Sequence, residues 1–244
     1  MITSKILSKH KKINHGFFNR NGGKSNGIYK SLNCGSGSSD QKNKIKKNLE
    51  IVKNKITKKK SRNIFLVHQV HSNKFVYVDK NFKLKKKKIK ADAIITNQRK
   101  VPIAVLTADC VPILLYDNEK NIIAAIHAGW KGAFKGIVNN VISFMHKKGC
   151  KKKSIFAAIG PCIGRKSYNV KDDFKKRFLK KDISNKTYFS YKKNTIYFDL
   201  ANYVRSQLKL NKITNIDMKN IDTFNKKNNF FSARRSLRLK HDDY

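Results

Sequence analysis

The chain has 244 residues, 39% of them hydrophobic, and a formal net charge of +41. The apolar residues gather in clear runs, which excludes a wholly disordered chain. The charge suggests nucleic-acid binding, but only nine of the 56 basic residues are arginine and no DNA- or RNA-binding motif is present. We interpret the lysine runs chiefly as solvated faces and expect no specific nucleic-acid partner, although an electrostatic role for the runs stays open.

The first half of the chain predicts a loop, a helix and then several strands. Residues 13–40 are rich in Gly, Ser and Asn, which is typical of loops. Residues 41–54 carry apolar side chains at helical spacing. Six short apolar runs with β-branched residues then predict strands, at 64–70, 74–79, 93–96, 101–107, 111–117 and 122–128.

The second half mixes helices and strands. Residues 129–149 predict a turn and a helix that ends at Gly149, with one apolar face formed by Ala133, Ile137, Val141, Phe144 and Met145. A strand at 154–160, helices at about 171–180 and 199–209, and a last strand at 229–235 follow. We expect one α/β domain of the mixed α+β kind over residues 1–244, with a mixed sheet, flanking helices and a first segment, 1–12, that could be flexible.

The thiols and the N-terminal segment predict the cellular compartment. The four cysteines form no CxxC pair, and the opening MITSKILSKHKK lacks the apolar core of a signal peptide. No stretch approaches the roughly 20 apolar residues of a membrane span. These features predict a cytoplasmic protein with free thiols and no membrane partner. Nothing in the sequence indicates an oligomeric state.

Three residues that commonly bind zinc follow directly on, or end, strand-like runs: His71, Cys110 and His127. Strand ends hold side chains rigidly, as a metal site requires. Two imidazoles and one thiolate form a typical open zinc set, with a fourth position for water or substrate. Their wide separation matches no short zinc motif, so two other interpretations stay open. One is structural packing and hydrogen bonding, and the other is a Cys-His hydrolase.

Ordered sequence blocks resemble a known family over essentially the whole chain. They are HGFFNRNGG (15–23), SLNCG (31–35), VHQVHSN (67–73), ADAIIT (91–96), VPIAVLTADCVPILLYD (101–117), AAIHAGWKGAFKGIV (124–138), AAIGPCIGRKSYNV (157–170), DLANYVRSQL (199–208) and FFSARR (230–235). Together they resemble the laccase-domain family, long labelled polyphenol oxidases and also called peptidoglycan editing factors. Its members are regarded as purine nucleoside phosphorylases with adenosine deaminase activity.

The resemblance implies a single mixed α/β domain and a Zn²⁺ held by two His and one Cys. On this sequence those ligands are His71, Cys110 and His127, the same three residues. Three positions depart from the family pattern. Lys131 stands where Arg is usual, Asn169 where an acid is common, and Asp222 where a Cys usually precedes the Thr. These departures bear on substrate preference, because none removes a metal ligand.

The implied substrates are purine nucleosides, namely adenosine or inosine and as a further candidate methylthioadenosine, together with phosphate. Phosphorolysis needs cationic groups for phosphate, and the candidates among the basic residues inside the blocks are Arg20, Lys131, Arg234 and Arg235. We favour Arg20 and one of Arg234 and Arg235 as anion binders, with surface salt bridges as the alternative.

Deamination in zinc deaminases uses a glutamate to move the proton. The only two glutamates here, Glu50 and Glu119, lie outside every block. Asp109, beside Cys110, is therefore the leading candidate for the proton shuttle and Asp92 the second. Asp109 could instead orient a ligating histidine. His68 is expected to be structural, since in a strand it would point away from the face of His71.

Three other functions remain as alternatives. A multicopper centre fits poorly, because the chain has seven histidines and no His-x-His pair. The His₂Cys set could still take up Cu²⁺ in vitro and support a copper-dependent polyphenol oxidase activity. A Cys-His hydrolase that edits peptidoglycan precursors is the second alternative, and a non-enzymatic nucleic-acid binder is the third.

Overall fold

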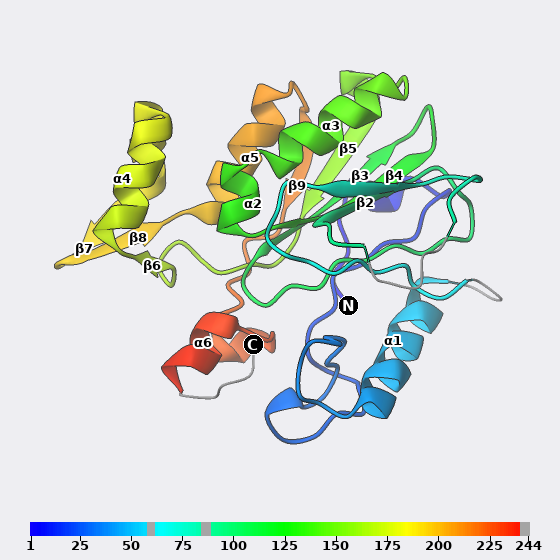
Figure 1. Cartoon of the computed structure of the whole chain (residues 1–244), viewed down its shortest axis with the longest axis horizontal. Coiled ribbons are helices and arrows are strands. Elements are labelled where there is room, and N and C mark those ends of the chain that lie inside the picture. Colours follow the sequence, from blue (N-terminus) through cyan, green and yellow to red (C-terminus); the bar gives the residue numbers. More distant parts are fainter. Residues whose placement is uncertain (58–61, 84–88, 240–244) are drawn as a thin grey trace.

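A six-stranded mixed sheet forms the centre of the fold (Figure 1). The computed structural model describes residues 1–57, 62–83 and 89–239. The two outer strand pairs of the sheet are parallel and the inner neighbours antiparallel, which confirms the predicted mixed sheet. The order is β1 (Phe75–Val78), β2 (Ala93–Thr96), β4 (Ile122–Ala128), β3 (Val111–Asp117), β5 (Ile155–Ile159) and β9 (Asn215–Met218).

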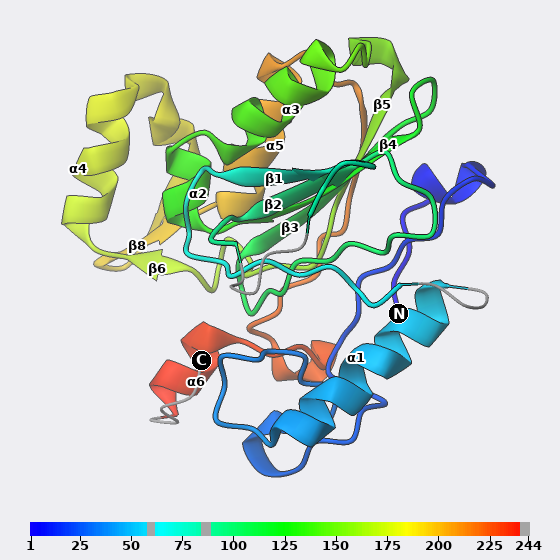
Figure 2. The same cartoon turned by 45° about the vertical axis from the view of Figure 1, so that its right-hand side comes forward.

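Helices cover one face of this sheet and build the main core. They are α2 (Trp130–Phe134), α3 (Ile137–Lys147) and α5 (Leu200–Leu210), and both views place them on the same side (Figures 1 and 2). The predicted apolar face of 129–149 is confirmed, since its members are buried or packed against the core. The predicted single helix is divided in two, because Gly136 adopts a φ of 85° between α2 and α3.

Extended segments cover the opposite face. Residues 64–70 and 101–107 are not strands, which corrects the prediction. They make only isolated bridges, such as Phe65 with Ile103, and pack apolar side chains such as Val67 and Val101 against Ile94 of β2. They are apolar because they lie on the sheet, and they do not join its ladder.

The N-terminal segment packs on the same face, farther along the sheet. Leu7 and Phe17 are buried against Tyr116 of β3 and Ala158 of β5. Helix α1 (Lys42–Ile56) lies on this side of the sheet, opposite α3, in both views (Figures 1 and 2). It confirms the helix predicted at 41–54.

A small excursion leaves the main sheet after β5. It contains β6 (Asn169–Val170), α4 (Asp172–Lys181), β7 (Phe189–Lys192) and β8 (Thr195–Phe198), and the three strands form their own sheet in the order β6-β8-β7. Phe174 and Phe178 of α4 stack at 4.6 Å between ring centroids and pack on Phe198 of β8. The helices predicted at 171–180 and 199–209 are confirmed, whereas the hairpin β7–β8 and strand β9 were not predicted.

The C-terminal segment differs from the prediction. Residues 229–235 do not form a strand: Asn229 adopts a φ of 57°, and α6 (Ala233–Arg238) begins within the run. The cause is local, because the side chain of Ser232 accepts a hydrogen bond from Arg235 N and so caps the helix. In the described residues, no helix has the length and apolar character needed to cross a membrane.

Asp217 on β9 fastens the N-terminal segment, and this contact gives a testable pH dependence. Its Oδ2 accepts hydrogen bonds from Ser4 Oγ at 2.8 Å and Lys5 N at 2.7 Å, and Lys219 Nζ lies at 3.1 Å. Burial would raise its pKa, but the hydrogen bonds from Ser4, Lys219 and Lys5 leave the pKa below its ordinary value. The carboxylate therefore stabilises the fold above the ordinary pKa of about 3.9, and this contribution is lost as the pH falls through the lower folded value.

We expect Asp217→Asn to lower the free energy of unfolding at pH 7 by about 1 kcal/mol. Urea unfolding of both proteins between pH 7 and pH 3 measures this. The difference should shrink below about pH 4, where the unfolded carboxyl is protonated. A difference that stays constant over this range would contradict the assigned role of the charge.

Candidate metal centre

His71, Cys110 and His127 converge at one end of the sheet. His71 lies in the loop before β1, Cys110 directly precedes β3, and His127 is the next-to-last residue of β4. Strands β3 and β4 pair with Pro112 opposite His127, which brings Cys110 to the histidine. One ligand atom from each of the three residues lies within 4.8 Å of the others, and no other such cluster of three occurs among the described residues.

The donor set fits a divalent metal of tetrahedral preference. The Cys110 Sγ and His71 Nε2 atoms are 3.6 Å apart, and the two imidazole rings meet edge to face at 4.8 Å between centroids. Tetrahedral Zn²⁺ with ordinary Zn–S and Zn–N bonds would place S and N about 3.6 Å apart. His71 is exposed whereas His127 is 3% exposed, so the side of the site at His71 is open to a small molecule.

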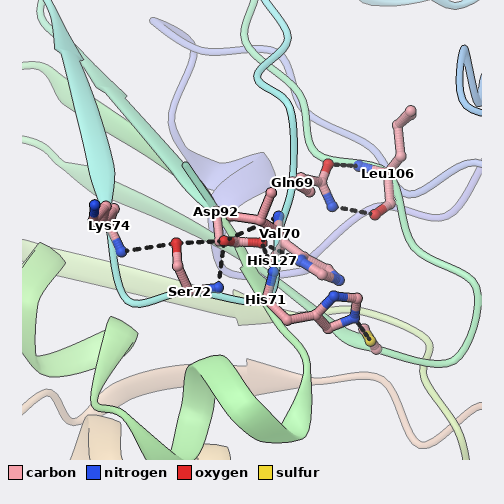
Figure 3. A network of polar contacts seen from close by, with 9 residues as sticks. Gln69, Val70, His71, Ser72, Lys74, Asp92, Leu106 and His127 are labelled. Carbon is pink, nitrogen blue, oxygen red and sulfur yellow. Dashed lines mark hydrogen bonds and ion pairs between the residues drawn. The ribbon is translucent and has the colours of Figure 1, made fainter. Parts of the chain in front are cut away.

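Asp92 holds the two histidines in place (Figure 3). Its carboxylate is fully buried and accepts a hydrogen bond from His127 Nδ1 at 2.9 Å. It also accepts from the backbone of His71 and from both the backbone and the hydroxyl of Ser72. Because Nδ1 of His127 is occupied by Asp92, Nε2 is left as the donor atom for a metal.

The protonation states around this carboxylate follow from the same contacts. Burial would raise the pKa of Asp92, but hydrogen bonds from His127 and Ser72 lower it to about 2. The pKa of His127 rises to about 9: burial opposes the rise, and the contacts with Asp92 and Cys110 outweigh burial. A carboxylate ionised at neutral pH is what a ligating imidazole needs behind it.

Cys110 differs in reactivity from the other three cysteines. Burial would raise its pKa, but hydrogen bonds with His127 and His71 lower it to about 7. Burial alone raises the pKa of Cys34 to about 12, and burial first, followed by Asp117, does the same for Cys150. Burial also raises the pKa of Cys162. Cys110 is therefore the thiol with thiolate character near neutral pH, as metal binding or nucleophilic attack requires.

Gln69 couples the two segments that carry His71 and Cys110 (Figure 3). Its side-chain oxygen accepts from Leu106 N and its side-chain nitrogen donates to Leu106 O, both at 2.8 Å. One amide thus satisfies both backbone groups of a residue outside any ladder. The two segments, which are not strands, are held in register here by a side chain.

Gly129 leaves the space that the cluster needs. A Cβ at this position would lie 2.5 Å from His71 Cδ2 and 2.9 Å from Cys110 Sγ. The residue has an ordinary φ of −67°, so the requirement is steric and not conformational. The glycine of the HAGWKG block is therefore a site residue that the sequence analysis did not identify. Its position two residues after a predicted ligand was the available signal.

Asp109 faces the C-terminal segment. One carboxylate oxygen accepts from Thr223 Oγ1 at 2.7 Å, and the other accepts from Ser232 Oγ at 2.9 Å and Arg234 N at 2.7 Å. Burial is the main cause that raises its pKa, although these hydrogen bonds oppose the rise. One oxygen thus ties the start of α6 to the segment of Cys110, and the other ties the loop at Thr223 to it.

The four predicted anion-binding residues take different positions. Arg234 lies closest to the cluster in the hydrogen-bond network: its backbone contacts Asp109, and its guanidinium lies 5.1 Å from the ring centroid of Tyr168. Its Nη1 donates to Asn169 O at 2.7 Å and to Asn169 Oδ1 at 2.6 Å. Asn169, noted above as a departure from the family pattern, therefore positions this arginine.

The other three basic residues contact other parts of the protein. Arg20 donates to the carbonyls of residues 28 and 30 and lies over the ring of Phe231 at 4.8 Å. Arg235 donates to the carbonyls of residues 223, 224 and 230. Lys131 is exposed on α2, with its Nζ 5.6 Å from the Trp130 ring centroid. The structure thus ties the backbone of Arg234 to Asp109, next to Cys110, and uses Arg20 and Arg235 to hold loops.

The fold and this candidate metal site agree with the laccase-domain resemblance, and comparison with known proteins shows the family. A family model described as multi-copper polyphenol oxidoreductase laccase matches residues 14–240, and the chain belongs to this family. Purine nucleoside phosphorylase RC0672 of Rickettsia conorii is 39% identical over 218 residues, covering 86% of this chain and 88% of the relative. Purine nucleoside phosphorylase RP494 of Rickettsia prowazekii is 40% identical over 185 residues, covering 74% of each.

A solved structure shares the fold as well. Protein NMB0706 of Neisseria meningitidis, described as a DUF152 protein, superposes with a TM-score of 0.78 at 29% identity, covering 89% of this chain and 86% of that one. The resemblance inferred from the sequence blocks is confirmed, and so is the expected fold class.

Gly129→Ala should weaken metal binding by at least tenfold, because the added methyl group would displace His71 and Cys110. Zn²⁺ affinity measured by competition with a chromophoric chelator tests this. Gly37→Ala is the matched control, since a Cβ there meets nothing within 4 Å. Unchanged affinity in a folded Gly129→Ala protein would show that the metal does not sit between these two side chains.

Proposed function

We propose that this protein is a zinc-dependent purine nucleoside phosphorylase that cleaves adenosine or inosine with phosphate. The observation that carries the proposal is the convergence of His71, Cys110 and His127, with the buried Asp92 behind His127. The names of the relatives supply the substrate class. Methylthioadenosine is a further candidate substrate, and adenosine deamination is proposed as a side activity.

Zinc is the proposed metal because of the donor set. Two imidazoles and a thiolate match an open zinc site with three protein ligands. The family description names several copper ions, but a multicopper centre needs more imidazoles than the three-residue cluster offers in the described residues. When bound, the metal supplies Lewis acidity at the open position. Copper could occupy the same ligands in vitro and give a weak oxidase activity.

Arg234 is the proposed phosphate-binding residue. In phosphorolysis a phosphate oxygen forms a bond to the anomeric carbon of the ribose while the bond from that carbon to the purine nitrogen breaks. The incoming group is an anion, and a guanidinium beside the cluster would hold it in place. Nη1 of Arg234 is used by Asn169. Within the described chain the Nε and Nη2 groups make no hydrogen bond to protein, so they are available to an anion.

Asp109 is proposed as a positioning residue and Asp92 as the residue that orients His127. Asp109 was the leading candidate for proton transfer, but its two oxygens already accept three hydrogen bonds from the C-terminal segment. These contacts favour a role in placing Arg234 next to Cys110. Any proton transferred in deamination would then pass through solvent or His71, which is the exposed member of the cluster.

A Cys-His hydrolase is the second candidate, and one observation favours it. Asp92, His127 and Cys110 form a chain in which a carboxylate orients an imidazole beside a thiol of lowered pKa. Without a metal this is the arrangement of an activated cysteine nucleophile. Such a site could act on an amide bond of peptidoglycan precursors: Sγ would bond to the carbonyl carbon as the C–N bond breaks, the amine would leave with a proton from His127, and water would then hydrolyse the thioester.

We expect the purified protein to contain about one zinc per chain and to release hypoxanthine from inosine only when phosphate is present. Cys110→Ser should abolish metal binding and reduce turnover by at least about 100-fold, because a ligand and the thiolate are lost together. Cys34→Ser is the matched control and should keep both. Base release is followed by chromatography and ribose 1-phosphate by phosphorus NMR.

Each alternative predicts a different outcome of this assay. Full turnover after removal of metal, blocked by a thiol alkylator, would reject the zinc enzyme in favour of the hydrolase. Base release without phosphate would show hydrolysis, and inosine formed from adenosine would show deamination. A protein that releases no base, yet binds DNA with steep salt dependence, would favour the nucleic-acid interpretation.

Asp109→Asn should raise the KM for phosphate about tenfold or more and leave the shape of the pH–rate profile unchanged, since the asparagine amide keeps one acceptor oxygen and its NH₂ group cannot accept from the donors at the other position. Thr223→Val removes the hydroxyl that donates to the other oxygen and should shift the same KM in the same direction. Loss of one limb of the pH–rate profile in Asp109→Asn, with Thr223→Val like wild type, would instead assign proton transfer to Asp109.

A further inference from the structure

A large apolar cavity lies on the face of the sheet opposite α3. Its volume is about 390 Å³, and it extends between β3, the N-terminal segment 13–20 and α1. The wall on the sheet is formed by Pro112, Leu114 and Ile123, and Phe17 closes one side. None of the three clustered residues of the metal centre lines it. It is therefore a second hollow and not the opening of the metal centre.

Helix α1 turns its apolar stripe toward this cavity. Leu49, Val52 and Ile56 line it, at spacings that place them on one face of the helix. Within α1 only Ile45 and Asn48 are buried. Asn48 fixes the helix through hydrogen bonds with Lys24 N, Ser25 Oγ and two backbone carbonyls. The helix is thus held by a polar anchor, while its apolar residues face a hollow.

Four of the polar side chains on the cavity wall are hydrogen-bonded to other parts of the protein. The guanidinium of Arg20 donates to two loop carbonyls, and the hydroxyl of Tyr116 donates to Asn121 at 3.1 Å. His15 accepts from Ser4 N at 2.8 Å, and the side chain of Asn33 bonds to residues 35, 38 and 40. An occupant would therefore meet mainly carbon atoms and needs no charge.

The size of the hollow defines the class of occupant. The hollow opens partly to solvent, and an apolar occupant would bury its surface against the lining. An apolar cavity of about 150 Å³ stays dry and binds benzene. This cavity is more than twice as large, at the lower end of the range for small-molecule sites.

We propose that the cavity between α1 and the second face of the sheet binds a neutral, apolar small molecule of two or three rings or comparable bulk. Binding there is separate from nucleoside binding at the metal centre. Thr107 and Ala108 line the cavity and directly precede Asp109 and Cys110. The occupant therefore lies against the segment that supplies the thiolate, so the two sites share one wall.

The test uses the neutral fluorescent probe N-phenyl-1-naphthylamine with the full-length protein. We expect saturable binding of one probe per chain, with a Kd on the order of 10–100 μM. Val52→Trp should weaken it at least tenfold by filling the cavity. Asn54→Trp, on the exposed side of the same helix, is the matched control and should bind like wild type. Circular dichroism and bound zinc show whether each variant is folded.

Leu49→Phe is a second variant with a smaller increase in volume, in case Val52→Trp does not fold. Absence of saturable binding to wild type would overturn the inference, and so would equal binding by the folded Val52→Trp and Asn54→Trp proteins. Inosine with phosphate should not displace the probe. Displacement would show that the cavity belongs to the nucleoside site, which would also overturn the inference of a separate apolar site.

Discussion

The buried carboxylate of Asp92 is the contact on which the site depends. It accepts from His127 Nδ1, from the backbone of His71 and from both donors of Ser72, so one side chain holds two of the three clustered residues. The sheet places it there. Strands β2 and β4 pair antiparallel, and the pairing is continued by a hydrogen bond from His127 N to Asp92 O at 2.7 Å. A fully buried charge is costly unless its hydrogen bonds are satisfied, and here the donors come from the groups that must be positioned. The energetic requirement of the carboxylate and the geometric requirement of the site are therefore met by the same contacts.

The sequence predicted the elements with strong periodicity and missed those set by tertiary contacts. The amphipathic pattern of α3 and the apolar runs of β3 and β4 specify their structure locally, and strand ends then indicated His71, Cys110 and His127. Residues 64–70 and 101–107 have the same apolar character, but they cover the sheet and do not extend it. Composition cannot separate these cases, because both bury apolar side chains and differ only in the partners of their backbone groups. The strand predicted at 229–235 failed for another reason: Ser232 caps a helix within an aromatic run.

Site residues that act by shape were also beyond reach of the sequence analysis. The chemical character of a thiol or an imidazole can be read from its residue type, whereas Gly129 matters because of what it lacks, and only the packed structure shows that a Cβ would collide with His71 and Cys110. The arginines show a second limit of prediction from sequence, because their residue type does not show which of them lies at the site. The sequence favoured Arg20 and one of Arg234 and Arg235 as anion binders, yet Arg20 and Arg235 satisfy loop carbonyls, and Arg234 is the one whose backbone bonds to Asp109 beside Cys110. Which arginine binds which backbone carbonyls depends on tertiary contacts that the sequence does not show.

Two aspartates flank the cluster, and their environments give them opposite properties. Asp92 receives a hydrogen bond from His127 and stays ionised, with a pKa of about 2. Asp109 receives only neutral donors, and burial raises its pKa. The first can therefore stabilise positive charge on the imidazole of His127, whereas the second is better suited to join neutral segments of chain. Because Asp109 adjoins Cys110 and bonds to Thr223, Ser232 and Arg234 N, a single residue links the segment of Cys110 to the backbone of Arg234. In this way Asp109 holds together segments that lie more than 100 residues apart in the sequence.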